Sequence, residues 1–194
     1  RLADLRPRDE LSGEVTRLCG QAGMLVDCGA ERPGYLPAGE LRDGFPTEGL
    51  WFQVGDRIDF ARVLRVHTRG LVLTLRSGGL KRGPRREVVD RRDADVSAFA
   101  RLPPDAWLRG AVKEMSTAGV YVILETPGGG PYISAMLHRS EFRRGYEDEA
   151  IEGGEVDVRV LSVDVAGGSV KLSMRDPSEA RRAPARGAAA GDGR

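Results

Sequence analysis

Aromatic residues, cysteine and histidine are all scarce in this sequence. Of its 194 residues, 6% are aromatic, two are cysteine and two are histidine. Neither the cysteines nor the histidines have the spacing of a zinc site, and no nucleophile stands in the setting of a known catalytic motif. We therefore expect no catalytic residues, no metal site and no cofactor, and we expect that the protein is not an enzyme.

An excess of one charge and long apolar runs are missing as well. The formal net charge is +1, which excludes the polybasic proteins whose affinity for nucleic acid rests on phosphate neutralisation alone. No run reaches the roughly 18 apolar residues of a membrane span, so we expect no membrane partner. The chain begins at Arg1 rather than Met, as expected of a fragment or of a chain from which a targeting segment has been removed.

Glycine is plentiful, with 26 residues, and it separates short runs in which apolar and polar residues alternate. Such runs predict strands. Residues 11–76 and 108–176 contain the same five runs in the same order, which is an internal repeat. The matching pairs are LSGEVTRL with LRGAVKEM, AGMLVDCG with AGVYVILE, YLPAGEL with MLHRSEF, VGDRIDFARVLRV with GGEVDVRVLSV, and LVLTLR with VKLSMR.

Each copy therefore predicts five short strands. Five twisted strands bury their apolar face by closing into a small barrel, which also removes the sheet edges. The second copy carries an insertion, TPGGGPYIS, that we expect to extend the hairpin between its second and third strands.

Three further segments lie outside the two copies. Residues 1–10 are a charged lead-in. Residues 77–107 are a basic linker with a possible short helix within 87–102, and residues 177–194 have few bulky apolar side chains and are expected to be a disordered tail.

The order of the five motifs resembles the S-one RNA-binding domain, the repeat found in the largest protein of the small ribosomal subunit. In the second copy, GVYV and MLHRSEF stand where that family has a strand-two aromatic residue and a strand-three histidine. The resemblance covers both copies and implies an all-β fold, with two five-stranded OB-fold barrels in tandem joined by the basic linker. It also implies that single-stranded RNA binds to one barrel face by base stacking and phosphate contacts.

The resemblance assigns candidate RNA-binding residues to the second copy. Alternation places Tyr121 opposite Val120 and Val122, and therefore outside the barrel. The other candidates in this copy are His138, Arg139, Asp164, Lys171 and Arg175. The linker adds a basic cluster, which is either a set of phosphate contacts or a solvated linker, made of Lys81, Arg82, Arg85 and Arg86.

The first copy has lost this set. Leu25 stands at the aromatic position and Pro37 at the histidine position. Arg65, Arg69 and Arg76 remain as possible phosphate contacts. We therefore expect weak RNA binding or none from the first barrel, which would instead dock on a protein.

These features favour a non-enzymatic protein of the translation machinery that binds single-stranded messenger RNA near the small ribosomal subunit. One alternative is a docking subunit of a large organellar ribonucleoprotein or RNA polymerase, in which the barrels contact proteins. Another is an adaptor for RNA decay or processing. The missing initial Met and the Arg-, Ala- and Gly-rich composition favour an organelle, a plastid over a mitochondrion, with the bacterial cytoplasm as the alternative location.

Overall fold

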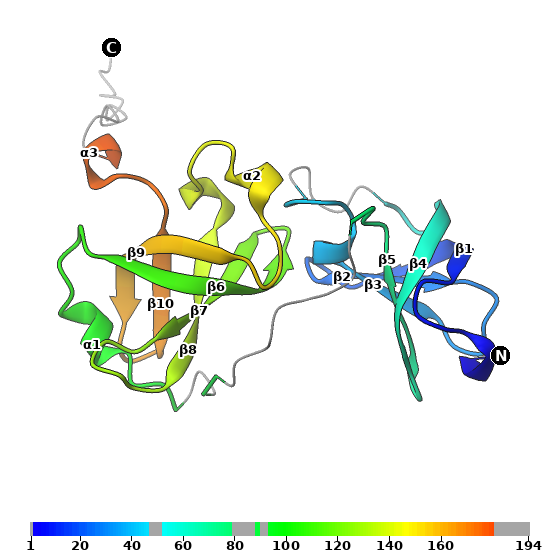
Figure 1. Cartoon of the computed structure of the whole chain (residues 1–194), viewed down its shortest axis with the longest axis horizontal. Helices are drawn as coiled ribbons and strands as arrows, with labels where there is room; N and C mark the ends of the chain where they lie inside the picture. The colour runs from blue at the N-terminus through cyan, green and yellow to red at the C-terminus, as the bar shows by residue number, and fades with distance from the viewer. Residues whose placement is uncertain (1, 47–51, 79–87, 90–92, 181–194) are drawn as a thin grey trace, which may run out of the picture.

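The computed structural model describes residues 2–46, 52–78, 88–89 and 93–180, and within them it contains two closed barrels of five strands each (Figure 1). The predicted all-β class with two barrels is confirmed. The helical elements are short: η1 (Leu2–Asp4), η2 (Ala38–Glu40), α1 (Ser97–Ala100), η3 (Arg139–Glu141), α2 (Tyr146–Glu149) and α3 (Pro177–Ala180). None of the helices in these ranges is long and apolar enough to cross a membrane.

The two barrels have the same topology. The first consists of β1 (Glu10–Leu18), β2 (Gly23–Asp27), β3 (Gly34–Pro37), β4 (Arg57–His67) and β5 (Gly70–Thr74). The second consists of β6 (Trp107–Ser116), β7 (Gly119–Glu125), β8 (Tyr132–His138), β9 (Glu155–Asp164) and β10 (Ser169–Ser173). In each barrel the third and fifth strands pair in parallel, the other pairs are antiparallel, and the fourth strand closes on the first. This strand order fits tandem OB-fold domains.

A glycine in the first strand of each copy lets the barrel close. A Cβ atom on Gly13 would collide with the backbone oxygen of Asp27, and one on Gly110 would lie 2.7 Å from the backbone oxygen of Ile123. Only glycine allows so close an approach between neighbouring strands. The repeated glycine in LSGEV and LRGAV is therefore a requirement of the barrel.

The last strand of each copy ends in the same hydrogen-bonded turn. The side-chain oxygens of Thr74 and Ser173, both fully buried, accept the backbone N–H groups of Arg76 and Arg175 at 3.1 and 3.0 Å. The repeated LTLR and LSMR sequences thus encode a shared strand end.

An arginine on the fourth strand secures the same strand end. In the second barrel, Arg159 is buried and its Nε donates to the backbone oxygen of Arg175 at 2.6 Å. In the first barrel, Arg62 Nη2 donates to the backbone oxygens of Arg76 and Gly78. The segment that leaves each barrel is therefore held by an internal arginine.

The segment that follows η2 in the first barrel packs into the second barrel. Phe45 belongs to the first copy, but its side chain is fully buried in the hydrophobic core of the second barrel. Its ring packs edge-to-face on Phe142, with 5.0 Å between the centroids. Its N–H donates to the backbone oxygen of Glu147 in α2 at 2.6 Å. The first copy thus completes the core of the second barrel.

A glycine makes this insertion possible. Gly44 has φ +93°, and a Cβ atom there would lie 2.7 Å from the backbone oxygen of Glu147. Beside it, Arg42 Nη2 lies 3.3 Å from Asp148 Oδ1. Figure 1 shows the segment after η2 reaching the side of the second barrel that carries α2.

The segments outside the barrels include α1, which lies within residues 87–102, where the sequence predicted a possible short helix. Val96 and Phe99, from the predicted linker, are buried in the second core, and α1 is a single turn at that point. The tail predicted to be disordered from residue 177 begins with α3, and its residues from 181 lie outside the described residues. The burial of Val96 and Phe99 in the core of the second barrel stabilises the single turn α1.

Candidate nucleic-acid interface

The outer face of the second barrel carries one row of side chains across its strands. Tyr121 on β7 pairs with Met136 on β8, which in turn pairs with Lys171 on β10. Tyr121 is 37% exposed, while its neighbours Val120 and Val122 are fully buried. The expected outward direction of Tyr121 agrees with this burial, and Lys171 is exposed on the same face.

His138 ends β8 on the same face, two residues beyond Met136. Its Nδ1 accepts the backbone N–H of Ser140 at 3.2 Å and lies 2.8 Å from Ser140 Oγ. A backbone N–H only donates, so the proton of a neutral His138 ring lies on Nε2. The exposed ring therefore offers an N–H donor at the end of the strand.

The parallel pairing of β8 and β10 gathers the basic candidates at one end of the face. Met174 N donates to the backbone oxygen of Glu141 at 2.9 Å, which holds the residues after β10 against η3. Arg175 and Arg139 are both exposed at this end, near His138. The ring of Tyr121 and the side chain of Lys171 thus lie on one face. The basic residues at its end are His138, Arg139 and Arg175.

Asp164 lies apart from this group. It ends β9 and pairs with Ser169, the first residue of β10, whereas Arg175 lies past the last residue of β10. Its Oδ1 accepts the N–H of Gly167 at 2.8 Å. The contact identifies Asp164 as a turn-forming residue at the opposite end of the strand.

Two further sets of basic candidates have different outcomes. The linker cluster of Lys81, Arg82, Arg85 and Arg86 lies outside the described residues. In the first barrel, Arg65 and Arg69 are exposed, but the Arg76 side chain is only 11% exposed and pairs with Asp43 at 3.3 Å. The ion pair makes Arg76 a poor phosphate contact.

The first barrel carries an outward aromatic residue, Tyr35, at a position that the family pattern does not mark as aromatic. Tyr35 on β3 lies on the outer face, paired with Leu25 on β2 and with Val72 on β5. Its hydroxyl donates to the backbone oxygen of Ala22 at 2.8 Å. The repeat aligns Tyr35 with Met136, so the signal was the alternation of GYLP, in which Tyr35 points outward between buried Gly34 and Leu36.

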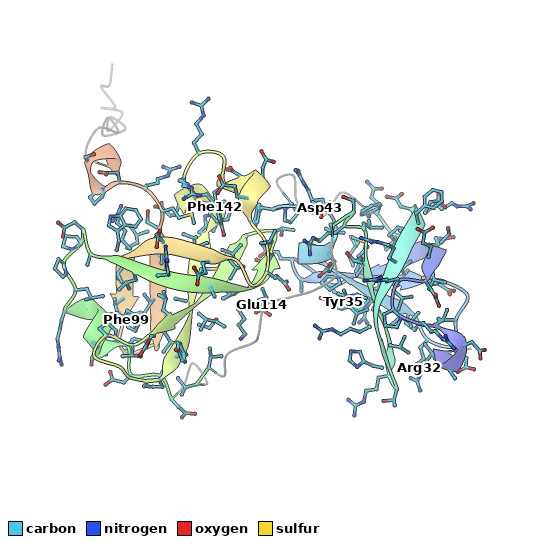
Figure 2. All side chains as sticks on the ribbon, in the orientation of Figure 1. Arg32, Tyr35, Asp43, Phe99, Glu114 and Phe142 are labelled. Carbon is cyan, nitrogen blue, oxygen red and sulfur yellow. The ribbon has the colours of Figure 1, made fainter. Side chains whose placement is uncertain are left out.

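Tyr35 faces a groove of about 530 Å³ between the two barrels. The turns β1–β2 and β6–β7 meet here, with Thr117 N donating to the backbone oxygen of Gln21 at 3.3 Å. Figure 2 shows Glu114 of the second barrel on the side that faces Tyr35. The residues that line the groove include Tyr35, Glu40 and Arg65 of the first barrel and Glu114, Tyr121 and Glu152 of the second.

The electrostatics of Tyr35 agree with this proximity. Burial raises the pKa of the Tyr35 hydroxyl above its usual value of 10.0, and the nearby Cys19 and Glu114 raise the pKa further. The influence of Glu114, which belongs to β6, means that the two outer faces are within electrostatic reach of each other.

The described residues contain no group of three or more histidine, cysteine, aspartate or glutamate side chains placed to hold a metal ion. The two tyrosines and the charged side chains of the two faces offer stacking, hydrogen bonding and charge.

Comparison with known proteins gives little further information. No protein-family model matches the chain, and no curated protein does. Among solved structures, the chain is similar to a multidomain protein with nucleic acid binding domains from Streptococcus pneumoniae TIGR4, at 19% identity and a TM-score of 0.31. The match covers 89% of this chain and 54% of that one, so the chain spans about half the length of its structural neighbour.

Proposed function

We propose that this chain binds single-stranded RNA on the outer face of β7, β8 and β10 and is not an enzyme. The observation that carries the proposal is the exposed ring of Tyr121 in one row with Lys171, next to the basic end of the face. A base that stacks on an exposed aromatic ring contributes roughly 1–3 kcal/mol to binding, whatever its sequence.

The charges on this face fit a strand whose phosphates run along β8 and β10. Lys171 lies beside the aromatic ring, and Arg139 and Arg175 continue the positive charge past the strand ends. His138 Nε2–H adds a donor for a phosphate or base oxygen. Because the net charge of the chain is only +1, binding would depend on this local cluster rather than on a general attraction.

The finer proposal is that the RNA is messenger RNA bound near the small ribosomal subunit, in an organelle or a bacterium. It is supported by the resemblance of the repeated motifs to the S-one domain. The ribosome or another large ribonucleoprotein assembly would then be the partner of the first barrel.

A protein-docking role for the first barrel has an observation of its own. Phe60 is an extra residue in β4, with no counterpart in the shorter run of β9, and it sits at a bulge with φ +59°. Its side chain is 75% exposed. Residues held in such sparsely populated backbone conformations cluster at functional sites, so the exposed Phe60 supports the docking alternative for this barrel.

The direct test is RNA binding by the full chain, measured by fluorescence anisotropy with a uridine-rich 12-mer across a salt series. We expect affinity to fall as salt rises, because phosphate contacts release counterions. Tyr121→Ala should weaken binding by about 5-fold or more at each salt concentration, through the loss of one stacked base.

Trp107→Ala is the matched control, because Trp107 is also an exposed aromatic residue of the second barrel but begins β6, away from the row. It should leave the affinity within about twofold. Equal losses in both variants, or no binding by the folded full chain at low salt, would contradict the proposal and favour a docking protein.

A further inference from the structure

We propose that the groove between the barrels is a base-selective pocket that takes one guanine of the bound strand. The inference rests on the proposed function and extends it from sequence-tolerant stacking to the choice of a base. It makes the first barrel, through Tyr35, part of the RNA site.

The first step is that two tyrosines from different barrels line one groove. Tyr121 reaches it from the second barrel and Tyr35 from the first. The hydrogen bond from the Tyr35 hydroxyl to Ala22 O fixes one wall. A volume of about 530 Å³ is in the range of ligand pockets and has room for a nucleotide.

The second step is that the groove exists before any ligand binds. The burial of Phe45 in the second core and the contact between Thr117 N and Gln21 O set the two barrels against each other. A pocket whose walls are fixed in advance loses little entropy when a ligand enters, so it can discriminate between bases that differ in a single group.

The third step is the charge of the groove. Glu114 is the β6 neighbour of Tyr121 in the strand register, and its side chain is exposed. Within the described residues, Glu114 has no ion pair. Arg65 of the first barrel also lines the groove. Because the exposed Glu114 carboxylate repels phosphate, a nucleotide would enter base first and leave its phosphate outside the groove.

The fourth step is the match between a carboxylate and guanine. An ionised carboxylate has two oxygens that only accept hydrogen bonds. On its Watson–Crick edge, guanine has two adjacent donors, N1–H and the 2-amino group, which a carboxylate can bind together. Adenine and cytosine place an acceptor beside their amino group, and uracil places its single N–H between two carbonyls. Glu114 therefore favours guanine over the other three bases, with a bound base stacked on tyrosine.

The test uses the full chain and four uridine nonamers whose central nucleotide is uridine, adenosine, guanosine or inosine. Guanosine should bind about tenfold more tightly than uridine or adenosine, a discrimination typical of one bidentate contact. Inosine, which lacks the 2-amino group, should fall between them. Glu114→Gln should bring all four affinities to within about twofold.

Glu125→Gln is the control, because Glu125 is an exposed glutamate at the far end of β7, away from the groove residues. It should keep the guanine preference. Equal affinities for the four RNAs would overturn the pocket but leave the proposed function standing, while no binding to any of them would overturn both. A guanine preference that survives Glu114→Gln would also overturn the pocket. The pocket would likewise be overturned if an arginine-rich peptide bound the groove through Glu114 while the four RNAs bound with equal affinity.

Discussion

Asp43 links the end of the first barrel to the loop that enters the second. Its carboxylate accepts hydrogen bonds from the Ser77 hydroxyl and from the N–H groups of Ser77 and Gly78, and it pairs with Arg76. Phe45, the residue buried in the second core, lies two positions further along the chain. A single exposed carboxylate thus anchors the base of the inter-barrel loop.

These contacts give the stability of the loop a pH dependence. The Ser77 hydrogen bond, followed by the backbone N–H groups and Arg76, holds the pKa of Asp43 below its ordinary 3.8, against a smaller opposing effect of burial. A carboxylate whose pKa is lower in the folded state stabilises the fold above its unfolded pKa, and the stabilisation disappears as pH falls through the folded pKa.

We therefore predict that Asp43→Asn lowers the melting temperature at pH 7, and that the difference from the original chain shrinks as the pH falls below 3.8 and through the lowered pKa of folded Asp43. Thermal unfolding followed by circular dichroism across this range measures the difference. Asp59→Asn serves as a control, because Asp59 is an exposed carboxylate whose ion pair among the described residues is with Arg57 in its own strand. A constant gap between Asp43→Asn and the original chain at every pH would contradict the prediction.

At the scale of the strand, the hydroxyl that ends β5 or β10 explains why both copies repeat Thr or Ser two residues before Arg. Thr74→Val keeps the shape of the side chain but leaves the N–H of Arg76 without its acceptor. We predict a loss of about 1 kcal/mol in the free energy of unfolding, the usual consequence of removing one partner of a buried hydrogen bond. Urea denaturation measures the loss.

Thr74→Ser separates the hydroxyl from the methyl group. It retains the acceptor for Arg76 N, so any loss it shows is due to packing alone. If Thr74→Val were as stable as the original chain, or less destabilising than Thr74→Ser, the hydroxyl would have no structural role at this strand end.

Most strands could be predicted because alternation is a local signal. In GVYV, alternation predicts that Tyr121 points away from Val120 and Val122, and in the structure Tyr121 is exposed between these two buried residues. The family pattern did not predict Tyr35, because it has its aromatic residue and histidine at the positions of Leu25 and Pro37. The alternation of GYLP would have identified Tyr35 as an outward aromatic residue beside them.

The contacts between barrels could not be predicted from such patterns. Phe45 stands in DGFP, a short loop in which one aromatic residue has no periodic neighbours, and its partner Phe142 lies in the other copy. No local rule connects two residues so far apart in the chain. For the same reason the sequence predicted two barrels in tandem but not the groove that contains Tyr35 and Tyr121.

At the scale of the whole molecule, the burial of Phe45 couples the two barrels. Phe45→Ala should destabilise the second barrel by about 3–5 kcal/mol, as expected when a buried phenylalanine is truncated. Hydrogen exchange of the full chain, read by mass spectrometry, should then show faster exchange in β7 and β8, although the substitution lies in the first copy.

Phe52→Ala is the comparison, because Phe52 packs against the core of the first barrel instead. It should increase exchange in the strands of that barrel. Two variants that both affect only the first barrel would mean that Phe45 does not contribute to the second core.

The measurement that decides most directly whether the outer face holds RNA is ultraviolet crosslinking of the full chain to a single-stranded RNA that contains one guanosine, with mass spectrometry of the crosslinked peptides. We predict crosslinks in the β7 peptide that contains Tyr121 and in the β3 peptide that contains Tyr35, both lost when salt is raised. Crosslinks confined to other parts of the chain, or a folded protein that yields none at low salt, would contradict RNA binding at this face.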